Sequence, residues 1–338
     1  MKRHPKANTI HVSPGFSKLI EATRGLCFEP HDIARQLDDR GRYEVELNRE
    51  FPFLVKLFHF TSRQHTRGAT WHERLELFMP MDGLARFRMG DQEVELDRGD
   101  LLAVDHLKLH HVVDFPRFDT RVVVISFMPE FVYSLGSPSH DYTFLLPFYS
   151  RSQGHPHVLR STDAAASCVC LAMAHLLERY FSGDDRQFYQ AGCKAAFLDI
   201  LYHLARHFQS SELLPWEFVR QQERSLRLKP LFEHISRNFG ERLTVADAAA
   251  LAHMSEAQLM KVFKKVAGVT LVAYLNHVRL SNAAHLLKET TRSIAAIANE
   301  VGFADQCYFD RRFKASFGQS PKEFREGVVA SKRRTNAF

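Results

Sequence analysis

The chain has 338 residues, of which 45% are apolar and 25% are charged, and its net charge is +6. This length allows two domains, and this composition excludes a wholly disordered chain. The longest weakly polar run is too short to cross a bilayer and no apolar signal core follows Met1, so we expect a cytoplasmic protein without a membrane partner. Five scattered cysteines fit neither a disulfide framework nor a structural zinc site.

Short segments of alternating polar and apolar residues fill the stretch between Phe53 and Phe127. Seven strands are predicted, at 53–60, 75–79, 84–89, 92–96, 101–104, 111–115 and 122–127. Turn-forming residues separate several of them, as at 89–92 and 97–100. Many short strands at regular spacing indicate a β-sandwich or a β-barrel.

Two histidines and a glutamate occur in or beside these strands at a distinctive spacing. His72 is followed by Glu76 and then by Gly83, and Gly99 precedes His110. This spacing resembles the two sequence signatures of the cupin barrel.

The metal-ligand set of cupin enzymes is incomplete in this chain. The position two residues before His72, which is a histidine in those enzymes, is Thr70 here. His111 or His59 could substitute for it. Without a substitute, the two histidines of the signatures and Glu76 would form a metal site with three ligands.

The middle of the chain is predicted to be helical at 163–181 and 187–208, with a break at 182–185. The apolar stripes of these two helices fit a dimer interface and packing against the strands equally well. The polar segment 210–225 is predicted to be an interdomain linker.

The basic residues are concentrated in the last third of the chain. Residues 226–338 contain 18 Lys and Arg against 10 Asp and Glu, a net charge of +8, whereas residues 1–225 have a net charge of −2. Clustered positive charge is expected of a protein that binds a polyanion, because each phosphate contact releases condensed counterions.

The same basic third contains an internal repeat. Residues 244–249 resemble 293–298 at an offset of 49, and residues 263–264 match 313–314 at an offset of 50. Each copy predicts two short helices joined by a tight turn, because a hydroxyl or carboxylate N-cap precedes each helix. These N-caps are Thr244 and Ser255 in the first copy and Ser293 and Asp305 in the second.

The second helix of each copy has the features of a helix that reads DNA. Lys261 and Arg311 each lie six positions after the N-cap, and a helix in the major groove reads base edges with the exposed residues of its N-terminal turns. We predict base contacts by Ala257, Met260 and Lys261 in the first copy and by Gln306, Cys307, Tyr308 and Arg311 in the second. Phosphate contacts are predicted for Lys264, Lys265, Arg312 and Lys314.

A helix of about 18 residues, predicted near 271–287, joins the two copies. At about 1.5 Å per residue it spans roughly 27 Å, near the ~34 Å between successive major grooves on one face of DNA. One chain is therefore expected to reach two grooves.

Residues 226–327 resemble the DNA-binding domain of the AraC/XylS family. The resemblance rests on ordered motifs at 294–298, 301–303, 308–309, 312–314 and 318–325. It implies seven helices, promoter binding to double-stranded DNA, and activation through RNA polymerase. Ala257 and Met260 are apolar where relatives often have hydrogen-bonding side chains, so the first copy would read less sequence than the second.

Members of this family normally use the barrel to bind a metal-free effector, often a sugar or another small polar metabolite. The resemblance therefore implies no cofactor, a small-molecule effector, and a homodimer formed through helices in the middle of the chain. The predicted effector-binding residues are His59, Trp71, His72, Glu76, His110 and His111. Among them, His72, Glu76 and His110 are the strongest candidates, because a buried glutamate needs a polar partner.

The expected fold is an α+β multidomain chain. It comprises a cupin-like jelly-roll effector domain at 1–160, a helical dimerisation segment at 161–209, a linker at 210–225, an all-α DNA-binding domain with two helix-turn-helix motifs at 226–327, and a basic tail at 328–338. The expected function is effector-dependent, sequence-specific transcription regulation, and no enzyme activity is expected. Three alternatives stay open: a metal-dependent cupin enzyme fused to a DNA-binding domain, a constitutive DNA-binding protein whose barrel only dimerises, and a helical bundle for protein docking.

Overall fold

A computed structural model describes residues 13–30, 47–60, 72, 74–90, 92–105, 108, 110–116, 119–133, 141–149, 157–182, 187–208 and 215–326. All contacts and distances refer to this part of the chain. The predicted basic tail at 328–338 lies outside it.

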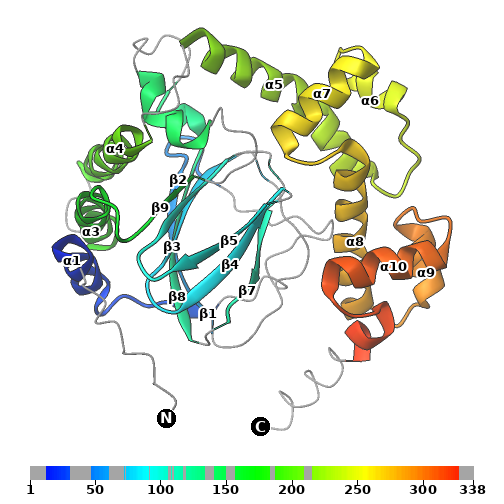
Figure 1. Cartoon of the computed structure of the whole chain (residues 1–338), viewed down its shortest axis with the longest axis horizontal. Coiled ribbons are helices and arrows are strands. Elements are labelled where there is room, and N and C mark those ends of the chain that lie inside the picture. The colour runs from blue at the N-terminus through cyan, green and yellow to red at the C-terminus, as the bar shows by residue number, and fades with distance from the viewer. Residues whose placement is uncertain are drawn as a thin grey trace, which may run out of the picture.

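The N-terminal region contains two β-sheets (Figure 1). One has six strands in the order β1-β2-β8-β3-β6-β9, and the other has three in the order β5-β4-β7. The seven predicted strands are confirmed, whereas β1 and β9 were not predicted. The bounds are β1 Glu29–Pro30, β2 Phe53–Phe60, β3 Leu75–Pro80, β4 Leu84–Met89, β5 Gln92–Asp97, β6 Leu101–Val104, β7 His110–Asp114, β8 Thr120–Phe127 and β9 His157–Leu159.

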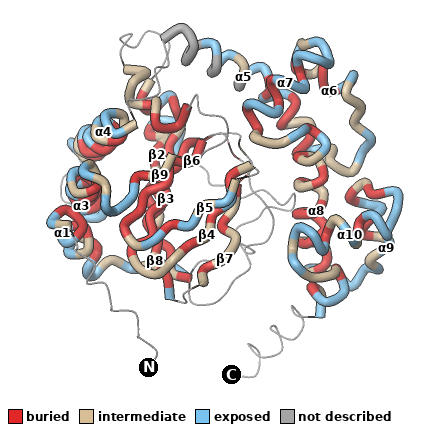
Figure 2. The backbone as a smooth tube through the Cα atoms, viewed as in Figure 1, coloured by how far each residue is buried: buried red, intermediate tan, exposed pale blue. Residues whose placement is uncertain are grey.

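The six-stranded sheet is buried on both faces because several of its strands carry apolar residues on both sides (Figure 2). Phe58 and Phe60 of β2 face the smaller sheet and share a core with Phe87 of β4. Val55 and Leu57 face the other way, into a core shared with three helices. These helices are α1 Pro14–Thr23, α3 Ala166–Ser182 and α4 Tyr189–His207. The region therefore has three layers: helices, large sheet and small sheet.

Helices α3 and α4 confirm the two helices predicted in the middle of the chain, whereas α1 and the 3₁₀ segments Pro129–Phe131 and Asp141–Phe148 were not predicted. Leu177 and Leu201 are fully buried in the core beneath the large sheet. Leu171 and Tyr202 are exposed by 41% and 46%. Most of the apolar stripe therefore packs within the chain, and only a small apolar part remains on the surface.

The segment predicted to be an interdomain linker, 210–225, is helical from Pro215 onward, a helix that was not predicted. Helix α5 runs from Pro215 to Asn238, and its second half enters the core of the C-terminal region through Leu228, Phe232 and Ile235. Its polar composition is typical of a solvent-exposed helix as well as of a loop.

The C-terminal region consists of two helix pairs joined by a long helix (Figure 1). The bounds are α6 Val245–Leu251, α7 Glu256–Ala267, α8 Leu271–Glu289, α9 Ile294–Glu300 and α10 Gln306–Phe317. The predicted N-caps are confirmed: the side chains of Thr244, Ser255, Ser293 and Asp305 each accept a backbone N–H of the following turn. Both α7 and α10 end at a glycine in the left-handed conformation, with φ values of 74° and 73°. The repeat in the sequence is therefore a repeat in structure.

Helix α8 has 19 residues and is shared by two separate cores. Leu271, Tyr274 and Val278 pack in the core of the first pair. Ala283 and Leu287 pack in the core of the second pair. No helix in the described part of the chain has the length and apolarity needed to cross a membrane.

Gly302→Ala should destabilise the second helix pair. Gly302 has φ +89°, and a Cβ there would lie 2.7 Å from the carbonyl oxygen of Gly240 and 2.9 Å from the Arg279 guanidinium. We expect the free energy of unfolding to fall by about 2–3 kcal/mol, measured by urea denaturation. Gly318→Ala is the matched control, because Gly318 has φ +73° and nothing lies within 4 Å of its added Cβ. An equal loss in both variants would contradict the steric argument.

Candidate functional site

The predicted reading surface of the first helix pair is accessible. Ala257, Met260 and Lys261 are exposed on α7, as are Lys264 and Lys265 in its last turns. They are exposed because Leu259, Phe263 and Val266 occupy the opposite side of the helix and enter the core. The caps at both ends satisfy backbone groups that a DNA-bound helix would otherwise expose.

The second helix pair presents a matching surface on α10. Phe309 and Phe313 are fully buried, and this fixes which side of the helix faces solvent. Gln306, Cys307, Tyr308, Arg311 and Lys314 are exposed, as predicted. Tyr308 also packs against Phe303, with 5.9 Å between the ring centroids, so its ring is held in place.

Arg312 differs from the other predicted phosphate contacts. It is half-buried, its Nε makes no hydrogen bond within the described residues, and its charge acts on His277 of α8. Its neighbour Arg311 is fully accessible. A role between α10 and α8 therefore fits Arg312 better than a phosphate contact.

The N-terminal region brings His72, Glu76 and His110 together. One ligand atom from each lies within 4.8 Å of the others, and all three residues are buried. Glu76 lies on β3, between Leu75 and Leu77 of the helix-facing core, so its side chain faces the smaller sheet. His110 begins β7 of that smaller sheet. The predicted trio thus lies between the two sheets.

Two further residues contact Glu76 and were not predicted. Arg74 Nε donates to Glu76 Oε1 at 2.8 Å, and Ser126 Oγ donates to the same oxygen at 2.8 Å. Arg74 precedes Glu76 by two residues, a strand spacing that could have revealed the pair. Ser126 lies directly opposite Glu76 in the β3–β8 register, which the sequence does not reveal.

The second oxygen of the carboxylate faces the two imidazoles. His72 Nε2 lies 3.3 Å and His110 Nε2 lies 4.0 Å from Glu76 Oε2. Burial lowers the pKa of His72 and lowers the pKa of His110 to about 3, so both rings are neutral at pH 7. Burial opposes ionisation of Glu76, but the charged Arg74 guanidinium beside it favours the carboxylate and lowers the pKa of Glu76.

Backbone carbonyls fix the tautomer of both histidines. His72 Nδ1 contacts the carbonyl oxygen of Arg74 at 2.9 Å, and His110 Nδ1 contacts that of Lys108 at 2.7 Å. A carbonyl oxygen only accepts, so each Nδ1 must donate, and each Nε2 presents a lone pair. The cluster therefore gathers two imidazole lone pairs and one carboxylate oxygen, all of them acceptors.

The other predicted effector contacts do not join this cluster. His59 lies on the opposite face of β2 from Phe58 and Phe60, where it pairs with Asp119. His111 follows His110 and therefore points to the other face of β7. Strand alternation turns His59 and His111 away from the cluster, which corrects the prediction that both line the same effector site as His72, Glu76 and His110. Trp71 lies outside the described residues.

Comparison with known proteins agrees with the C-terminal geometry. A family model described as a helix-turn-helix domain matches residues 248–327. Over 94 residues the chain is 40% identical to the bifunctional transcriptional activator/DNA repair enzyme AdaA of Bacillus subtilis, a match that covers 28% of this chain and 44% of AdaA. Over 295 residues it is 20% identical to the HTH-type transcriptional regulator YdeC of Bacillus subtilis, covering 85% of this chain and 97% of that protein.

The chain thus spans less than half the length of AdaA. Among solved structures, ToxT of Vibrio cholerae O395 aligns with 82% of this chain and 98% of its own, at 14% identity and a TM-score of 0.48. Over 105 residues the chain is also 35% identical to the HTH-type transcriptional activator RhaS of Enterobacter, covering 31% of this chain and 38% of that protein. The C-terminal region is thus a helix-turn-helix domain similar to those of these transcriptional regulators, as its resemblance to the AraC/XylS family implied.

Proposed function

We propose that the chain is a sequence-specific DNA-binding regulator that reads two successive major grooves with α7 and α10. The observation that supports this most directly is the duplicated geometry. Each of the two helices has a side-chain N-cap, a left-handed glycine at its end and exposed cationic residues, and each packs against a different part of α8. At about 1.5 Å per residue, the 19 residues of α8 span roughly 28 Å. This is close enough to the ~34 Å groove repeat that a modest bend of DNA would bring both helices into grooves.

The proposed effector site is the cluster of His72, Glu76 and His110 inside a cupin-like N-terminal domain. Its three inward atoms all accept hydrogen bonds, so they favour a ligand that donates several, such as a sugar or another polyhydroxy metabolite. Arg74 already balances the charge of Glu76, which favours a neutral ligand over a cation. Effector binding would shift an existing equilibrium between two presentations of the DNA-binding domain.

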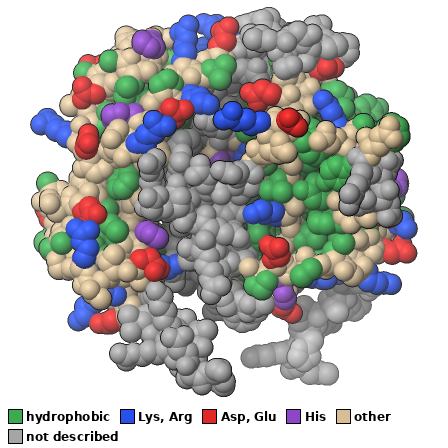
Figure 3. Space-filling view, turned by 180° about the vertical axis from the view of Figure 1, so that it is seen from behind, with side chains coloured by type: hydrophobic (Ala, Val, Ile, Leu, Met, Phe, Trp, Pro, Cys, Tyr) green, Lys and Arg blue, Asp and Glu red, His purple; other side chains and the backbone are tan. Residues whose placement is uncertain are grey.

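Self-association is part of this proposal. From behind, hydrophobic side chains gather on the half of the molecule formed by the N-terminal region (Figure 3). Leu171 of α3 and Tyr202 of α4 are among the exposed large apolar residues. A homodimer formed through these helices in the cytoplasm would present four reading helices to an operator and contact RNA polymerase beside it.

A divalent metal ion at the same three residues is the second candidate, and it would make the N-terminal domain a metal-dependent cupin. It is favoured by the tautomers, because a carbonyl that holds Nδ1–H and directs Nε2 inward is a common outer-shell arrangement of metal-binding histidines. The nearby Arg74 guanidinium opposes it, because a second cation would share one carboxylate.

Arg311→Ala should relax specificity, whereas Lys264→Ala should not. Arg311 lies at a base-reading position of α10, and its loss should cost about 1–3 kcal/mol at one base pair only. Lys264 is a phosphate contact, so its loss should weaken all sequences alike. Selection from a random duplex pool with wild-type protein gives the reference site, and anisotropy titrations of single-base variants measure the effect. A uniform loss in both variants would refute these roles.

Purified protein should contain no stoichiometric metal. Elemental analysis of wild-type protein and of His72→Ala, which removes one donor, checks this. Iron, manganese or zinc at one equivalent in wild type, lost in His72→Ala, would replace the effector proposal with the metal-dependent one.

A polyhydroxy effector should raise the melting temperature of wild-type protein. At about 100-fold excess over Kd the stabilisation is about 2.7 kcal/mol. Glu76→Gln should abolish this shift, because it replaces the acceptor Oε2 with a group that can carry N–H donors. Ser161→Ala is a control outside the cluster. If no metabolite of a broad panel stabilises the protein, the N-terminal domain does not act as a sensor.

A further inference from the structure

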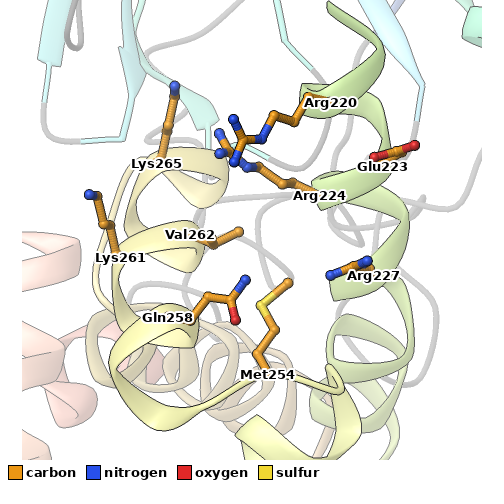
Figure 4. Close-up of a pocket in the computed structure, with 9 residues that line it drawn as sticks. All are labelled: Arg220, Glu223, Arg224, Arg227, Met254, Gln258, Lys261, Val262 and Lys265. Atoms are coloured by element: carbon orange, nitrogen blue, oxygen red, sulfur yellow. The ribbon is translucent and has the colours of Figure 1, made fainter. Parts of the chain in front are cut away.

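A cleft of about 530 Å³ lies between α5 and α7 (Figure 4). Five cationic side chains line it, Arg220, Arg224 and Arg227 from α5 and Lys261 and Lys265 from α7, against the single acidic residue Glu223. The three arginines occur at i, i+4 and i+7, so they form one stripe on α5. In Figure 4, Arg220 and Arg224 extend toward the α7 side of the cleft, where Lys261 and Lys265 lie.

The residues that line this cleft carry more positive than negative charge. Among the described residues no ion pair involves Arg220, Arg224 or Arg227, and Glu223 is one acid among five cations. Like charges gathered in one concave surface repel each other and raise the local positive potential. The cleft therefore favours an extended polyanion.

The position of the cleft on α7 indicates which polyanion. At 100° per residue, the cleft-lining Gln258, Lys261, Val262 and Lys265 are centred roughly 100° around the helix from the predicted base-reading Ala257, Met260 and Lys261. A helix of about 10–12 Å diameter fills a major groove about 12 Å wide, so its flanks lie against the two phosphate strands. The cleft lies along one of these flanks of α7, where a phosphate strand would run.

We propose that one DNA backbone strand lies in the cleft when α7 occupies the major groove, held between Lys265 of α7 and the arginines of α5. This inference rests on the proposed DNA-binding function and adds α5, which precedes the helix pairs, to the DNA interface. The arginine stripe spans seven residues, or about 10 Å, enough for about two or three phosphates at one per ~3.4 Å of helix axis.

The test uses the full chain and a random-sequence duplex, because phosphate contacts do not depend on base sequence. Affinity is measured by anisotropy from about 50 to about 200 mM salt. Arg224→Ala and Arg227→Ala should each reduce the slope of log affinity against log salt by about 0.9, which makes the affinity loss over this range about 3.5-fold smaller per variant. Arg237→Ala is the matched control, an exposed arginine of α5 outside the cleft, and should leave the slope unchanged.

Glu223→Gln should increase the affinity for duplex DNA, a change that a misfolded variant would not produce. It removes the one carboxylate among the residues that line the cleft, so binding of the same duplex should tighten about 1.5- to 5-fold, as expected for an exposed charge interaction. Weaker or unchanged binding would count against the strand in the cleft.

Three outcomes distinguish a failure of the proposed DNA-binding function from a failure of the cleft proposal. If wild type does not bind duplex, the proposed function fails. If wild type binds with a salt slope that Arg224→Ala and Arg227→Ala leave unchanged, the helix-turn-helix function stands and the cleft proposal is overturned. It is also overturned if the slope is unchanged but inorganic pyrophosphate stabilises wild type and not Arg224→Ala, because the cleft would then bind a small polyanion.

Discussion

The C-terminal region depends on one constraint: α8 is a core element of two helix pairs at once. Its first half is buried with Phe232 and Phe263, and its second half with Phe309 and Phe313. Neither α7 nor α10 can change its position relative to α8 without opening a core in which large aromatic side chains are fully buried. The spacing of the two reading helices is therefore set by packing rather than by a flexible connection. Arg279 adds to it by donating to the carbonyl oxygens of Phe239 and Glu241, which ties α8 to the end of α5.

The interior of the N-terminal region, unlike the apolar cores around α8, contains a buried carboxylate. Most of the space between its sheets is filled by phenylalanine, valine and leucine, yet an ionised carboxylate lies there as well. A buried charge is retained only where partners compensate for its lost hydration. Arg74 and Ser126 compensate on one oxygen, and the second oxygen faces two lone pairs that repel it. A ligand that donates hydrogen bonds to this second oxygen and to the two imidazoles would relieve the repulsion and stabilise the cluster.

Much of this organisation was predictable from the sequence, for identifiable physical reasons. The strands followed from alternation, and the caps at Thr244, Ser255, Ser293 and Asp305 followed from local chemistry. Features that depend on pairing between distant segments were not predictable. Ser126 meets Glu76 only through the register of β3 with β8, and His59 and His111 leave the cluster only because of which strand face is buried. The arginine stripe of α5 was missed for another reason: its polar surroundings were interpreted as a linker, so helical periodicity was not considered there.

The uninterrupted course of α5 has a mechanical consequence. A flexible tether would let the N-terminal region move without affecting the helices that follow, but α5 is a continuous helix of 24 residues, about 36 Å along its axis, with Pro230 in its interior. Its C-terminal half is anchored in the core by Leu231 and Ile235. A tilt of about 10° around that anchor would carry the first turn through about 4 Å. The helix thus acts as a lever arm, and the width of the cationic cleft would change with any reorientation of the domain attached to its far end.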